Sequence, residues 1–326
     1  MGRRQAMVAI LILCVSWLAT SAHGQELTSG RFMRPHPLLS LLALTPDEPF
    51  AVRGTPFLRY TDFSAIRRLP ARASDCSGNA AFDPAALYAP PGIDPRQIER
   101  ALLFGDPPAN GLILEGDFEP EALAHALHAS GYTQRDEQGI LLLQPEPDAG
   151  NAGDRRDSVA LAGRYLLRTP KPSLLDELVN AYIGYRQSLF TRPGVLALAQ
   201  ALSRQTGDML RAAFFFAGAL PPGLPKLATT EGDGNGLVAL AQYRDGAAWM
   251  TALALVYDAR DSARVAARML ADELENRMRH HTALWIEAPV VYEDSSGDYF
   301  VALARVRHQD DVCVIGADWL IEETPR

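Results

Sequence analysis

The sequence lacks the motifs that would assign it a chemistry. Its 326 residues contain no Gly-x-Ser-x-Gly elbow, no Ser-x-x-Lys pair with a downstream partner, no His-Glu-x-x-His helix and no Gly-x-x-x-x-Gly-Lys phosphate loop. Such motifs hold a nucleophile, a zinc ion or a phosphate at fixed spacing. Their absence argues against the common hydrolase and nucleotide-binding classes, so we predict no cofactor and favour a non-catalytic protein.

Basic residues are also scarce. Lysine occurs only at Lys171 and Lys226, and the formal net charge is −8. Removal of a leader that contains Arg3 and Arg4 would bring the net charge to −10. Because phosphate neutralisation by Lys and Arg dominates affinity for nucleic acids, an acidic chain without a basic run is not expected to bind them.

Only three cysteines are present, and Cys14 lies in the leader. The other two are Cys76 and Cys313. In an oxidising compartment a disulfide could join the two and tie an early segment to the last one. Alternatively they are separate thiols, with Cys313 packed as a small apolar side chain among valines. The sequence leaves both alternatives open.

Residues 1–24 have the pattern of a bacterial export signal. Arg3 and Arg4 precede an apolar run at 6–19, and Ala22 and Gly24 supply the small residues that a signal peptidase reads. The run is shorter than the roughly 20 residues that span a bilayer core. We therefore predict cleavage before Gln25 and an exported, periplasmic or extracellular protein. The alternative is an uncleaved anchor, and no later stretch is apolar enough to span a membrane.

The stretch 111–219 predicts a ferredoxin-like β-α-β-β-α-β unit of the α+β class. The apolar and turn patterns predict strands at 112–114, 139–143, 159–167 and 210–217, and helices beginning at Pro120, at Ser173 as a capping residue, and at Pro193. One antiparallel sheet with helices on a single face would result. This fold hosts many activities and therefore assigns none.

The flanking regions complete a two-unit architecture. Before the central unit we expect a strand at 54–60 that leads through Asp62 into a short helix, and a further helix at 94–102. After the linker we expect a hairpin across Arg244-Asp245-Gly246, a long helix at 262–280, a hairpin of 284–292 with 299–306 and a last strand at 312–321. The predicted divisions are a signal peptide at 1–24, an N-terminal segment at 25–110 that packs on the first unit, the ferredoxin-like unit at 111–219, a linker at 220–236 and a second α+β unit at 237–326.

Two groups of residues have spacing compatible with a metal ion. Glu231, Asp233 and Asn235 place oxygens at alternate positions before Gly236, as an EF-hand calcium loop does. However, the twelfth position is Gln242 and no helix flanks the loop, so a glycine-rich linker is the favoured interpretation. A second group, Glu121 with His125 and His128, lies along one helix but on its predicted solvent face, which favours a plain solvated surface.

Two further patterns bear on function. Asp62, Asp117 and Asp258 each follow an apolar strand and precede a helix, which suits helix capping; alternatively their carboxylates gather at one sheet end. Aromatic residues that could anchor a partner are Tyr182, Tyr185, Trp285 and Trp319, although core packing would use the same residue types.

Together these observations favour an exported non-catalytic binding or structural protein, working through a protein, peptide or envelope partner that the sequence does not identify. The alternative is an exported hydrolase with an unrecognised acid/base or metal site. A third hypothesis is a calcium-stabilised structural module.

Overall fold

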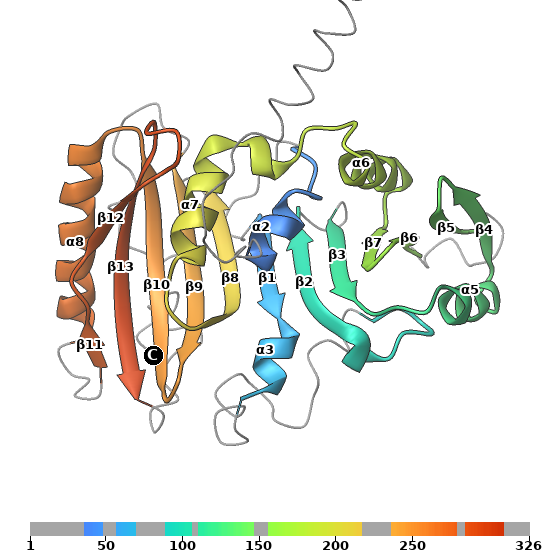
Figure 1. Cartoon of the computed structure of the whole chain (residues 1–326), viewed down its shortest axis with the longest axis horizontal. Coiled ribbons are helices and arrows are strands. Elements are labelled where there is room, and N and C mark those ends of the chain that lie inside the picture. Colours follow the sequence, from blue (N-terminus) through green and yellow to red (C-terminus); the bar gives the residue numbers. More distant parts are fainter. Residues whose placement is uncertain are drawn as a thin grey trace, which may run out of the picture. The chain divides into compact units, whose positions relative to one another are not determined.

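The described strands of this chain form one antiparallel sheet, and the helices pack on it. The computed structural model describes residues 36–47, 57–69, 89–105, 110–146, 156–216, 236–278 and 284–309, all within the unit His36–Arg326. The strands are β1(Leu58–Asp62), β2(Ile98–Phe104), β3(Gly111–Gly116), β4(Tyr132–Glu137), β5(Ile140–Pro145), β6(Ser158–Ala162), β7(Tyr165–Thr169), β8(Asp208–Phe216), β9(Leu237–Asp245), β10(Ala248–Tyr257), β11(Leu284–Ile286), β12(Val290–Glu293) and β13(Phe300–Gln309). Their order is β11-β13-β10-β9-β8-β1-β2-β3-β7-β6-β5-β4, and β12 also pairs with β13 (Figure 1). The predicted α+β class with a large antiparallel sheet is confirmed.

Glycine turns set two of the hairpins. The predicted turn after Asp245 is confirmed, since Asp245 pairs with Ala248 and Gly246 has a φ of 58°. A second tight turn begins at Gly163, also at a φ of 58°, and it divides the predicted strand 159–167 into β6 and β7. A glycine with positive φ at the first loop position matches the right-handed twist of the flanking strands.

Most helices begin with proline, whose missing N–H would have no partner in the first turn. The helices are α2(Pro37–Leu42), α3(Phe63–Arg67), α5(Pro120–His128), α6(Pro172–Tyr182), α7(Pro193–Ser203) and α8(Arg260–Met278), with 3₁₀ turns η3(Pro95–Gln97) and η4(Leu189–Thr191). The predicted helices at 120, 193–202 and 262–280 are confirmed within about two residues. The predicted Ser173 cap is wrong, because Lys171 is the N-cap of α6 and Pro172 is the first helical residue.

Helices cover both faces of the sheet, which corrects the prediction of a single covered face. Alternation along β10 shows this: Ala252 joins the core that contains Leu198 of α7, whereas Leu253 joins the core that contains Leu270 of α8. Neighbouring strand residues point to opposite faces, so α7 and α8 lie on opposite sides. β10 is buried on both faces, which explains its continuous apolar sequence.

The ferredoxin-like unit is not confirmed. Its expected last strand, β8, pairs with β1 and β9, and both β1 and β2 lie between β8 and β3 in the sheet. The strands of the two expected units also belong to one sheet, because β8 pairs with β9 across the predicted linker. Pairing partners depend on contacts far apart in sequence, which local patterns do not specify.

The predicted helix at 94–102 is wrong beyond its first turn. Asp94 caps only the 3₁₀ turn η3, and the chain then continues as β2 between β1 and β3. The predicted domain boundaries stay predictions. The signal peptide at 1–24, most of the linker at 220–236 and the last strand at 312–321 lie outside the described residues.

Candidate functional site

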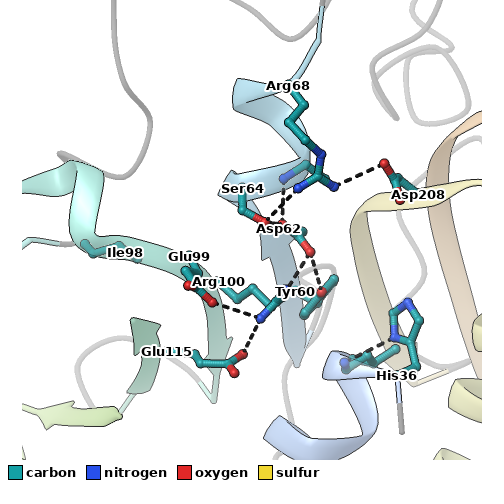
Figure 2. Close-up of polar contacts among 12 residues, drawn as sticks. His36, Tyr60, Asp62, Ser64, Arg68, Ile98, Glu99, Arg100, Glu115 and Asp208 are labelled. Atoms are coloured by element: carbon teal, nitrogen blue, oxygen red, sulfur yellow. Dashed lines mark hydrogen bonds and ion pairs between the residues drawn. The ribbon is translucent and has the colours of Figure 1, made fainter. Parts of the chain in front are cut away.

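A row of polar side chains crosses four neighbouring strands in the middle of the sheet, near one end of each strand. The register pairs Asp62 of β1 with Arg100 of β2, Arg100 with Glu115 of β3, and Glu115 with Tyr165 of β7. Directly paired residues of antiparallel strands point to the same face with adjacent Cβ atoms. The sheet itself therefore brings one arginine between two carboxylates, which Figure 2 shows for Asp62, Arg100 and Glu115.

Arg100 is the centre of this group, which we call the Arg100 network. Its Nε lies 3.0 Å from Oδ2 of Asp62, and its Nη1 lies 3.0 Å from Oε2 of Glu115 and 3.2 Å from Oε2 of Glu99. The β6–β7 turn adds Arg164, whose Nη2 lies 2.7 Å from Glu99 and whose Nε lies 3.2 Å from Oε1 of Glu115. Two guanidinium groups thus face three carboxylates, and each carboxylate contacts at least one of them.

Asp62 has a second task at the end of β1. Its Oδ1 accepts hydrogen bonds from the Ala65 N–H and the Ser64 hydroxyl, both at 2.7 Å, and so caps α3. The predicted capping role of Asp62 is confirmed. Asp117 is exposed, and the N-cap of α5 is Glu119, so the capping interpretation is wrong for Asp117. Asp258 is exposed two residues before α8 begins at Arg260, and its capping role stays a prediction. Neither joins the Arg100 network.

The centre of the network is shielded from water, whereas Glu99 and Arg164 at its edge are 39% and 50% exposed. The side chains of Asp62 and Glu115 are 10% and 8% exposed. Burial opposes the charge of Arg100, but the hydrogen bond to Glu115 and the charge of Asp62 outweigh it and raise the pKa of Arg100. Burial also raises the pKa of Tyr60 far above its usual value, and the adjacent Asp62 adds to this shift. The Tyr60 hydroxyl lies 3.4 Å from Oδ2 of Asp62.

His36 stands next to Tyr60, with ring centroids 6.2 Å apart. Its Nδ1 accepts a hydrogen bond of 3.2 Å from the Leu38 N–H, which makes His36 the N-cap of α2. Burial lowers the pKa of His36, an effect that Asp62 opposes and Arg100 supports. All three shifts hold these groups in their ordinary states at neutral pH: His36 neutral, Tyr60 protonated and Arg100 charged. The arrangement can therefore position backbone elements and anchor charge, but its shifted groups are not tuned to exchange protons near pH 7.

Sequence reasoning missed this network because it predicted a helix over β2. The segment Ile98–Phe104 contains Glu, Arg, Ala and Leu, which favour a helix, and pairing with two neighbouring strands overrides that preference. One signal was available. Arg100 follows a capped turn that ends at Gln97, and charged residues such as Glu99 and Arg100 at the start of an otherwise apolar segment are expected to have partners when they are buried.

The metal candidates of the sequence do not meet here. Glu121, His125 and His128 are exposed on α5, as predicted, and His128 is engaged with the Tyr132 carbonyl oxygen at 2.7 Å. Across the ranges that the structure describes, no three His, Cys, Asp or Glu side chains are grouped so that they could hold a metal ion. The remaining candidates lie outside the described residues: Cys76, Cys313, Glu231, Asp233, Asn235 and Trp319.

The fold defines an α+β protein built on one large antiparallel sheet. No protein-family model matches the chain, and no curated protein sequence matches it. Among solved structures it is similar to two crystal forms of TP0453. Form I is 11% identical, with 86% of this chain and 98% of that chain covered at a TM-score of 0.38; form III is 12% identical, with 83% and 94% covered at a TM-score of 0.36. At these values the similarity carries no argument about function.

None of the helices in the described ranges has the length and apolar character needed to cross a membrane.

Proposed function

We propose that this chain is an exported, non-catalytic binding protein of the cell envelope or the extracellular space. The observation that carries the proposal is the display of Tyr185, whose side chain is 79% exposed in the connection between α6 and η4. The connection is held at both ends, by a 2.8 Å bond from the Tyr185 N–H to the Asn180 carbonyl and by a 2.8 Å bond from the Leu189 N–H to the Thr45 carbonyl. A large aromatic side chain on a held loop loses little entropy on binding.

Of the other predicted aromatic anchors, one is exposed and one is packed against the core. Trp285 on β11 is 42% exposed and remains a candidate contact, whereas Tyr182 packs against the core and forms an edge-on pair with Tyr165 at 6.3 Å. The Arg100 network supports a non-catalytic role, because each of its carboxylates is engaged by at least one guanidinium group. We infer that the network stabilises the sheet, while binding takes place through exposed aromatic residues.

A photo-crosslinking experiment tests this proposal. A photoreactive phenylalanine analogue replaces Tyr185 in the exporting host, and the same analogue replaces Glu121, an exposed residue on α5, as the control. We expect position 185 to give a discrete adduct of protein, peptide or envelope material that position 121 does not give. Equal labelling at both positions would argue against Tyr185 as a binding residue. Sequencing the mature N-terminus tests export separately, with Gln25 expected first.

The second candidate, an exported hydrolase, is favoured by one feature of the site. Asp62 and Glu115 are buried carboxylates within one network that also contains Tyr60, and enzymes use paired carboxylates for acid/base work. Assays with ester, glycan and phosphate substrates test this candidate. Turnover that disappears in Glu115→Gln while the variant remains folded would replace the binding proposal with a hydrolase.

A further inference from the structure

The outward face of α8 exposes both apolar and charged side chains. The helix packs on the sheet through small and apolar residues: Ala263, Ala266, Ala267, Leu270 and Leu274. On its other side Val265 is 57% and Met269 45% exposed, one turn apart. Figure 1 shows the helix beside β12 and β13, the strands it contacts.

Charges on this face are separated along the helix. Arg264 and Arg268 lie in its first half, and Asp272 and Glu275 lie in its second half, all four exposed. Arg264 is 3.2 Å from Asp261. Arg268 and Asp272 stand one turn apart, yet neither they nor Glu275 form an ion pair with any residue that the structure describes. Asp261 offsets Arg264 at the start of the face, so Arg268 supplies the net positive charge of the first half, Asp272 and Glu275 supply the negative charge of the second half, and Met269 lies between them.

We propose that this face docks against the same face of a second copy of the chain, with the two α8 helices antiparallel. A two-fold axis near Leu270 places Arg268 of each copy opposite Asp272 of the other, because both are equally distant from Leu270 in sequence. The same axis brings Arg264 near Glu275. A parallel arrangement would instead oppose like charges. A self-complementary surface of this kind is what a two-fold interface requires, and antiparallel helix dipoles also favour it.

The size of the face defines how strong this dimer can be. A helix of 19 residues is about 28 Å long at 1.5 Å per residue and about 10 Å wide, so one face covers about 300 Å². Stable complexes bury about 800 Å² on each partner. We therefore expect a weak and reversible dimer, populated at about 0.1–1 mM protein. Burial of Val265 and Met269 supplies the apolar contribution, and the Arg268–Asp272 pairs determine the orientation.

Sedimentation equilibrium of the purified chain with charge reversals tests the proposal. Arg268→Glu and Asp272→Arg each place like charges across the axis, and each is expected to weaken self-association at least about tenfold. An equimolar mixture of the two variants restores complementary charges on both sides, so it should associate at least as well as the wild type. Salt at about 1 M should weaken the wild-type dimer by screening. Asp176→Arg, an exposed reversal on α6, is the matched control and should leave association unchanged.

The mixture distinguishes an interface from a folding defect, because two misfolded variants would not recover association when combined. A wild-type chain that stays monomeric up to about 1 mM would overturn the proposal, as would single variants that associate like the wild type or a mixture that does not recover. These outcomes do not depend on the crosslinking at Tyr185, so the dimer and the proposed binding function can fail separately.

Discussion

Replacement of Arg100 by methionine is the most direct test of the Arg100 network. Methionine keeps an unbranched apolar stem of similar length, so packing beside Tyr60 is largely preserved and the loss is electrostatic. The substitution removes the guanidinium that lies 3.0 Å from both Asp62 and Glu115, and it leaves two carboxylates that are only 10% and 8% exposed. Each of these two carboxylates then keeps its negative charge in a mostly buried position with fewer positive or hydrogen-bonding partners, which costs stability.

The size of the stability loss depends on which hydrogen-bond partners Asp62 and Glu115 retain after Arg100 is removed. A hydrogen bond to a charged group contributes about 1.5–3 kcal/mol, so the two bonds lost by the buried carboxylates of Asp62 and Glu115 set a range of about 3–6 kcal/mol. The third lost bond, to Glu99, adds little because that side chain is 39% exposed. Asp62 retains the Ala65 N–H and the Ser64 hydroxyl, and Glu115 retains Arg164 at 3.2 Å. We therefore expect Arg100→Met to lower the free energy of unfolding by about 3 kcal/mol at pH 7.

Urea unfolding followed by circular dichroism measures this change. With a slope of about 3 kcal/mol per molar urea, the midpoint should fall by about 1 M. Adding Glu115→Gln to Arg100→Met should recover about 1 kcal/mol, because it removes one of the uncompensated charges.

Arg59→Met is the matched control, since Arg59 is exposed on the same β1 strand. It should change stability by no more than about 0.5 kcal/mol. The reasoning is refuted if Arg100→Met is indistinguishable from this control at pH 7. It also fails if adding Glu115→Gln to Arg100→Met recovers no stability, since a pure packing loss would behave in that way.

Three other predictions concern local structure. Burial holds the pKa of His36 below 6.5. Neutral His36 therefore contributes its full stability above about pH 6.5, and this contribution is lost as the pH falls toward the lowered pKa. His36→Asn keeps a capping acceptor but does not titrate, so the urea midpoint of the variant should change less between about pH 7 and pH 5 than that of the wild type. Gln138 has a φ of 55° and the following Gly139 a φ of 79°, a turn geometry that prefers Asn-Gly. Gln138→Asn should therefore raise the free energy of unfolding, measured by urea unfolding, by about 0.5 kcal/mol. A decrease would contradict the assigned turn. A Cβ at Gly116 would clash with the Gln97 carbonyl oxygen, so Gly116→Ala should lower the thermal midpoint at a cost of about 1–3 kcal/mol, and an unchanged midpoint would contradict this close contact.

Local features of the fold could be predicted because their causes are local. The helix α8 shows its apolar period within its own sequence, and α7 begins at a proline that the first turn accommodates. The turn after Asp245 depends on the freedom of Gly246 to adopt positive φ. Capping of α3 by Asp62 required only a carboxylate within reach of free N–H groups. Each of these depends on residues a few positions apart, so the sequence by itself determined them.

The tertiary structure alone decided which strands are neighbours, and with that the candidate site. The segment of β2 has the composition of a helix, yet two flanking strands satisfy its backbone groups and make it a strand. This pairing brings Asp62, Arg100 and Glu115 into one row, although they lie far apart in the chain. Helix placement on both faces likewise follows from a sheet whose central strands are apolar on both sides. Hydrogen bonds between distant strands and burial of both sheet faces are properties of the whole chain, so no local stretch encodes them.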